Sequence, residues 1–64
     1  MKINNNKLDA ALARQSKNKT DLAKEGVVSL TTFQRIGAGV DVKPKTVGKI
    51  ARALDVDVSE IIEN

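Results

Sequence analysis

The sequence predicts an all-α fold, a compact bundle of five short helices in a single domain over residues 1–64. Three observations favour this fold class. Apolar residues recur three and four positions apart, which is the spacing of one helix face. No stretch shows the alternation of apolar and polar residues that indicates a strand. A chain of this length buries only about 60% of its unfolded surface, which is enough for one modest core.

The first six residues are polar apart from Ile3, and we expect residues 1–6 to form a flexible arm. Asn6 is placed to cap a first helix at about Lys7–Gln15. The buried face of that helix is predicted from three residues at helical spacing: Leu8, Ala11 and Leu12. Residues 16–18 break this pattern and are expected to form a short connection.

A second helix is expected from the cap Asn18 to about Lys24. Asp21 lies three residues after the cap, which gives a weaker relative of the Ser-x-x-Glu capping box and favours the helix dipole. The residues predicted to be buried here are Leu22 and Ala23. The next three residues, Gly26-Val27-Val28, are predicted to form a turn in which the glycine can adopt a positive φ without cost.

Val28 is expected to enter the core between the two helices that flank the turn. A third helix should begin after Ser29, whose hydroxyl can accept an otherwise unpaired backbone N–H. It should end at about Ile36, because Gly37-Ala38-Gly39 contains two poor helix formers. The stretch Leu22–Gly39 therefore predicts a helix-turn-helix.

The third helix is expected to be amphipathic. Phe33 and Ile36 fall three apart and should point into the core. The opposite, solvent-facing side is predicted to contain Thr31, Gln34, Arg35 and Ala38. Phe33 is the only aromatic residue, so a core position is favoured over a role in stacking on single-stranded bases.

Residues 40–43 are expected to form a loop before Pro44, which can start a helix because its missing N–H costs nothing there. This fourth helix, at about Pro44–Leu54, has the clearest period of the chain. Its packing residues are predicted to be Val47, Ile50, Ala51 and Leu54. Gly48 inside it costs about 1 kcal/mol relative to alanine, and close approach of another backbone would explain a glycine there.

Asp55 is expected to end the fourth helix, and Asp57 with Glu60 forms an acidic capping box for a last short helix. The apolar residues predicted to face the core here are Val56, Val58, Ile61 and Ile62. The two isoleucines either close the core or contribute in part to a dimer interface. The three acids resemble a metal cluster only superficially, because capping accounts for two of them.

The amino acids that are missing exclude several function classes. Without cysteine or histidine, the chain has no disulfide, thiol nucleophile, imidazole base or common zinc site. We therefore predict no catalytic residue, no metal, no cofactor and no small-molecule ligand, and an enzyme is the weakest hypothesis. The sequence has neither the apolar run of a signal peptide nor the roughly 20 apolar residues of a membrane span. A cytoplasmic protein is therefore expected.

Charge is distributed unevenly along the chain. Residues 55–64 contain four acidic and no basic residues, whereas the rest contains 11 basic and four acidic residues, a net charge of +7. This distribution suits a polyanionic partner that approaches from one side with salt-dependent affinity. An ordinary solvated surface of mixed charge is the alternative.

The predicted helix-turn-helix has an ordered set of residues: Leu22-Ala23, Val28-Ser29, Phe33, Ile36 and Gly39. Farther along, the fourth helix contains Lys49-Ile50-Ala51-Arg52-Ala53-Leu54, followed by Val56. This set resembles the Cro/cI-type (Xre) helix-turn-helix family of phage repressors and related bacterial regulators, over about Leu8 to Ile62. Three positions depart from the family's pattern: Val27 replaces a glycine of the turn, Lys19 a frequent glutamine and Gly37 a frequent glutamate.

The resemblance implies a lambda-repressor-like domain that binds double-stranded DNA, with the third helix in the major groove. The residues expected to contact bases are Leu30, Thr31, Gln34 and Arg35. Those expected to contact phosphates are Lys19, Ser29, Thr32, Lys43 and Lys45. Glutamine matches adenine and arginine matches guanine, and threonine and leucine can contact a thymine methyl group. The alternatives are solvated surface for Gln34 and Arg35, plain loop charges for Lys43 and Lys45, and a capping role for Ser29.

We therefore expect a sequence-specific transcriptional regulator, a repressor that occupies an operator as a homodimer. Two symmetric half-sites about 34 Å apart would multiply the specificity of one short helix. Such a protein would be encoded by a bacterium or a phage and would associate with the nucleoid when bound. The alternative is a protein-interaction module of the same fold, antitoxin-like or co-regulatory, whose acidic end at residues 55–64 contacts a protein partner.

Overall fold

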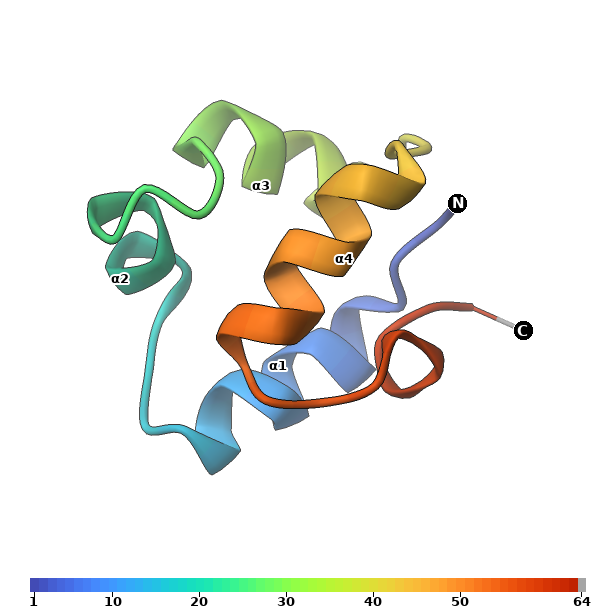
Figure 1. The fold of residues 1–64 in the computed structure, drawn as a ribbon. Coiled ribbons are helices and arrows are strands. Elements are labelled where there is room, and N and C mark those ends of the chain that lie inside the picture. The colour runs from blue at the N-terminus through green and yellow to red at the C-terminus, as the bar shows by residue number, and fades with distance from the viewer. Residues whose placement is uncertain (64) are drawn as a thin grey trace.

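The computed structural model describes residues 1–63 and contains four α-helices followed by a 3₁₀ turn (Figure 1). The elements are α1 (Asn5–Arg14), α2 (Lys19–Lys24), α3 (Leu30–Gly37), α4 (Pro44–Ala53) and η1 (Val58–Glu60). The all-α fold class is confirmed, with no strand in the described part of the chain beyond an isolated bridge. The predicted count of five helices is corrected, because the last element is a 3₁₀ turn of three residues.

The N-terminal residues pack against the rest of the chain, so the prediction of a flexible arm at residues 1–6 is wrong. Ile3 is only 4% exposed and pairs with Ile62 in an isolated antiparallel bridge. The first helix also begins two residues earlier than predicted, with Asn4 instead of Asn6 as its cap. The segments around Ile3 and Ile62, near the two ends of the chain, therefore lie side by side (Figure 1).

The core is built around α4, which crosses the middle of the molecule in Figure 1. Its predicted packing residues are at most 3% exposed: Val47, Ile50, Ala51 and Leu54. The other buried residues are Ile3, Leu8, Ala11, Leu12, Leu22, Phe33, Ile36 and Ile61. Several residues predicted to face the core are only half-buried, namely Ala23, Val28, Val56, Val58 and Ile62. Helices of 6 to 10 residues gain little stability from propensity alone, so this packing holds them.

All four α-helices end in the same hydrogen-bond pattern, the Schellman motif. After α2, Gly26 N donates to Ala23 O at 3.1 Å and Val27 N donates to Leu22 O at 3.0 Å. The residues with positive φ in the four motifs are Ser16, Gly26, Gly39 and Asp55. In the turn between α2 and α3 the left-handed position is therefore Gly26, as predicted, and the valine that follows needs no special conformation.

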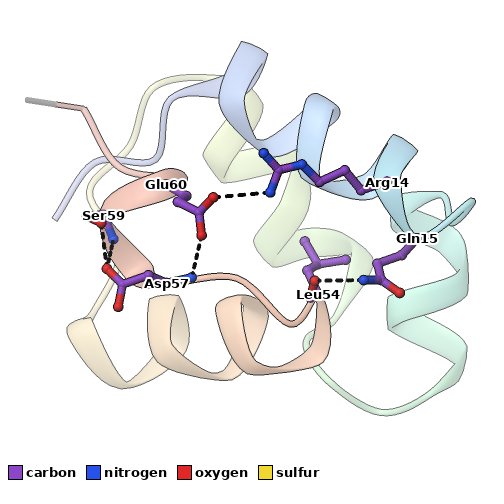
Figure 2. Close-up of polar contacts among 6 residues, drawn as sticks. All are labelled: Arg14, Gln15, Leu54, Asp57, Ser59 and Glu60. Carbon is purple, nitrogen blue, oxygen red and sulfur yellow. Dashed lines mark hydrogen bonds and ion pairs between the residues drawn. The ribbon is translucent and has the colours of Figure 1, made fainter.

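Polar side chains connect α1 to the end of α4 and to η1 (Figure 2). Gln15 Nε2 donates to Leu54 O at 3.2 Å, which satisfies a carbonyl near the end of α4. Arg14 Nη1 and Glu60 Oε1 lie 3.1 Å apart in an exposed ion pair. Exposed ion pairs typically contribute only about 0.2–1 kcal/mol to stability. The Arg14–Glu60 pair therefore orients the C-terminal segment more than it stabilises the fold.

The predicted acidic capping box is confirmed at η1. Asp57 N donates to Glu60 Oε2 at 2.9 Å, and Ser59 N donates to Asp57 Oδ2 at 3.0 Å. Hydrogen bonds from the Ser59 side chain and backbone lower the pKa of Asp57. The backbone N–H of Asp57, followed by the Arg14 side chain, lowers the pKa of Glu60. Both carboxyl groups are therefore easier to ionise in the folded protein.

We predict that Gly48→Ala stabilises the protein by about 1 kcal/mol, because alanine is the better helix former. A Cβ at this position would meet no atom within 4 Å, so the expected close approach of another backbone is wrong. Gly26→Ala is the matched control: its Cβ also meets no atom, but φ is +78°. It should destabilise by about 1–2 kcal/mol. Urea denaturation measures both, and equal shifts in the two variants would contradict this account.

We predict that acid weakens the fold through the capping box. A carboxyl group with a lowered folded pKa contributes stability above its unfolded pKa, and this stability is lost as the pH falls through the folded value. The free energy of unfolding should therefore decrease as the pH drops below about 4–5, and Glu60→Gln should flatten part of that decrease. Chemical denaturation at several pH values measures the slope. Glu63→Gln, outside the box, is the control, and an identical slope in both variants would refute the prediction.

Candidate nucleic-acid interface

Local contacts hold α2 and α3 in a fixed arrangement. At the start of α2, Asn18 N donates to Asp21 Oδ2 at 2.8 Å. The Asp21 side chain thus makes the hydrogen bond that the predicted capping box assigns to it. Lys17 Nζ lies 3.1 Å from Glu25 Oε1, so the segment before α2 is joined to the segment after it. The turn residues that pack against the core are Val27 and Val28. The two helices are neighbours in Figure 1. Contacts at both ends of α2 and packing of the turn against the core hold them in place.

The third helix has one buried and one exposed side, as predicted. Phe33 and Ile36 are 3% and 1% exposed. Ser29 caps the helix, since its Oγ accepts a hydrogen bond from Thr32 N at 3.2 Å. The exposed side contains all four residues predicted to contact bases: Leu30, Thr31, Gln34 and Arg35. A short helix with an amide, a guanidinium, a hydroxyl and an apolar group on one face can match hydrogen-bonding and methyl groups of another molecule.

The five residues predicted to contact phosphates lie at the starts of three helices. Lys19 is the first residue of α2 and is half-buried, whereas Lys43 and Lys45 flank the exposed start of α4. Ser29 Oγ lies 3.1 Å from Thr32 Oγ1, so these two hydroxyls already form a hydrogen bond with each other. Because helix N-termini have a partial positive charge, all three positions favour an anion.

A surface groove of about 290 Å³, here called the α3–α4 groove, lies between α3 and the start of α4. Its lining residues are Thr32, Arg35, Asp41, Val42, Lys43 and Thr46. Within residues 1–63, neither Arg35 nor Lys43 takes part in an ion pair. The cap residue Lys43 also provides no side-chain acceptor to the start of α4. The groove therefore combines two available cations with an uncapped helix start, which suits an anionic ligand.

The groove adds residues that the sequence analysis missed. Thr46 contributes a hydroxyl group next to the start of α4, and Asp41 is an acid that reduces the positive potential. The signal for Thr46 was its position two residues after Pro44, in the first turn of a helix. Arg35 lies both on the exposed side of α3 and in the groove, so it can reach a phosphate as well as a base edge.

Residues 1–63 offer neither a membrane-spanning helix nor a cluster of metal-ligating side chains. None of the helices there has the length and apolar character that a membrane crossing requires. No three side chains of His, Cys, Asp or Glu gather there in a group that could hold a metal ion.

Comparison with known proteins agrees with this geometry. Residues 7–64 match the family profile of the Cro/C1-type HTH DNA-binding domain. No curated protein and no solved structure shows a significant match to the chain. The family match extends from α1 through η1. It therefore includes α3, with its exposed polar side, and the α3–α4 groove. The chain therefore belongs to the family of Cro/C1-type helix-turn-helix DNA-binding domains.

Proposed function

We propose that this protein is a sequence-specific transcriptional regulator, a repressor that occupies an operator in double-stranded DNA as a homodimer. The observation that carries this proposal is the exposed side of α3, with Thr31, Gln34 and Arg35 next to the basic α3–α4 groove. A helix of this kind fits the major groove, where each base pair presents a distinct pattern of donors and acceptors. The protein would act in the cytoplasm of a bacterial cell, on the nucleoid.

Base contacts are assigned to the exposed side of α3. Gln34 would form two hydrogen bonds with an adenine, and Arg35 would form two with a guanine. Thr31 would donate to a base edge or contact a thymine methyl group, and Leu30, which is 48% exposed, would make an apolar contact with one. These four residues would set sequence preference.

Phosphate contacts are assigned to the helix starts. Lys43 and Lys45 would hold the DNA backbone at the start of α4, and Lys19 would do so at the start of α2. The hydroxyls of Ser29 and Thr32 would contribute at the start of α3, in addition to the capping bond of Ser29. These contacts would fix the register of α3 on the duplex and contribute most of the salt-dependent affinity.

The homodimer follows from the small size of the base-contacting surface. Four side chains on one helix specify only a few base pairs, whereas a two-fold dimer contacts two half-sites about 34 Å apart. Repression would follow from occupancy of the operator.

A second candidate function is a protein-interaction module of the same fold. A surface hollow of about 330 Å³ favours it, lined by Glu25, Gly26, Val27, Lys49, Arg52 and Ala53. This hollow lies between the turn of the helix-turn-helix and the second half of α4, apart from the α3–α4 groove. Co-purification of a stoichiometric protein partner, without salt-dependent affinity for DNA, would support this alternative.

We predict that Gln34→Ala and Arg35→Ala each remove sequence preference at a defined position of the operator. Selection from randomised duplexes should give the wild-type protein two half-sites one helical turn apart. Each variant should lose about 1–3 kcal/mol of discrimination, roughly 5-fold to 150-fold, at one base pair of each half-site. Ala38→Ser, a change at the C-cap of α3 and outside the assigned residues, is the control. If both alanine variants select the wild-type sequence, α3 does not contact the bases.

We predict that Lys43→Ala and Lys45→Ala weaken binding to all sequences by a similar factor. Loss of one phosphate contact should reduce affinity about fivefold to tenfold at 0.1 M salt. It should also reduce the salt slope by about 1. Fluorescence anisotropy at several salt concentrations measures both quantities. Lys49→Ala removes the same charge from the middle of α4, away from the helix start, and it is the matched control. If Lys49→Ala has the same effect as the other two variants, only net charge matters and the assignment fails.

A further inference from the structure

The first four residues, here called the N-terminal strap (Met1–Asn4), connect two distant segments of the chain. At one end, Val42 N donates to Met1 O at 2.7 Å and Met1 N donates to Val42 O at 2.8 Å. These two residues therefore exchange both backbone hydrogen bonds, although 41 positions separate them. The strap is in this way fixed to the loop that precedes α4.

At its other end the strap pairs with the C-terminal segment. Asn4 N donates to Ile61 O at 2.8 Å, and Glu63 N donates to Lys2 O at 3.0 Å. These bonds flank the antiparallel pair of Ile3 and Ile62. The Ile3 side chain is 4% exposed and belongs to the main core. The strap is therefore held by backbone hydrogen bonds at both ends and by apolar burial in its middle.

The residue that the strap holds, Val42, is part of the α3–α4 groove. It lies between the Schellman motif after α3, in which Val40 N donates to Arg35 O, and Lys43, the cap residue of α4. Val42 also packs against the core from a half-buried position. The Met1 bonds thus act on the backbone at the residue directly before the first basic side chain of the groove.

We propose that the N-terminal strap is a positioning segment for the loop that precedes α4 (residues 40–43). By holding Val42, the strap orders Lys43 and the start of α4 before DNA binds. This inference rests on the proposed DNA-binding function. A loop that is already ordered does not lose further conformational freedom on binding, so its phosphate contacts contribute more affinity. The strap itself needs no contact with DNA.

Two variants test this inference. Ile3→Ser removes the apolar anchor of the strap and should release it. The double change Ile3→Cys with Ile62→Cys should lock it, because opposed residues without mutual hydrogen bonds have Cα atoms about 4.5 Å apart. That separation lies within the range of about 4.4–6.8 Å that a disulfide requires. The chain has no cysteine of its own, so only the intended disulfide can form within it.

The measurements are hydrogen exchange of the Val42 amide and DNA affinity at several salt concentrations. Ile3→Ser should accelerate exchange at Val42, reduce affinity about threefold to tenfold, and lower the salt slope by about 1. The oxidised double-cysteine protein should bind like the wild type and lose affinity when it is reduced. Leu12→Ala is the control for general destabilisation, because it removes buried volume from α1 without changing a residue of the strap or of its backbone hydrogen-bond partners.

The possible outcomes separate the inference from the function on which it rests. If Ile3→Ser exchanges rapidly at Val42 but binds DNA with wild-type affinity and salt slope, the strap does not position the loop. If Leu12→Ala reduces affinity and slope as much as Ile3→Ser, the effect is only loss of stability and the inference is overturned. If oxidised and reduced double-cysteine proteins bind alike, the inference fails and the proposed function stands. If the wild-type protein itself has no salt-dependent affinity for DNA, the proposed function fails, and the inference fails with it.

Discussion

The packing of α4 is the constraint on which the rest of this protein depends. No helix in the part of the chain that the structure describes exceeds 10 residues, and helices of that length are marginal in water unless they bury an apolar face. α4 contributes Val47, Ile50 and Ala51 to the middle of the core. The same core receives Phe33 and Ile36 from α3. The exposed side of α3 is therefore oriented by the burial of its opposite side, and the helix-turn-helix has its shape only as part of the complete domain.

The four Schellman motifs determine where each helix stops and in which direction the chain leaves it. Both helices of the helix-turn-helix end at glycines, Gly26 and Gly39, which adopt the left-handed conformation without steric cost. The ends of α1 and α4 instead place Ser16 and Asp55 in that conformation. A positive φ strains the backbone of these two residues, because each has a Cβ. The two turns next to the proposed DNA surface have glycine at this position and avoid that strain.

The N-terminal and C-terminal segments differ in how they are connected to the proposed DNA surface. The acidic C-terminal segment packs on α1 and α4, where Glu60 pairs with Arg14 and where η1 lies in Figure 1. Four of its residues are acidic and none is basic, so the net positive charge belongs to the remaining part of the domain. The N-terminal strap joins this acidic segment to the loop at Val42, which lines the basic groove. A polyanion would thus approach the basic part of the domain, where the N-terminal strap holds the loop at Val42.

Local signals in the sequence were sufficient for most of the fold and for the family. Helix periods, the caps Asn18 and Ser29, the turn glycine Gly26 and the box of Asp57 with Glu60 all act within a few residues, so each could be predicted from neighbours in the chain. The exposed side of α3 followed from the same period.

The burial of Ile3, the early start of α1 and the α3–α4 groove could not be predicted in this way. A single apolar residue among polar ones has no period, and the backbone partners of the strap lie far along the chain at Val42 and Ile61–Glu63. The sequence by itself determined which segments become helices and which side chains face outward, because those preferences are local. Only the tertiary structure decided that both chain ends join the core and that α3 and α4 enclose a basic groove, because these features exist only where packing brings distant backbone segments together.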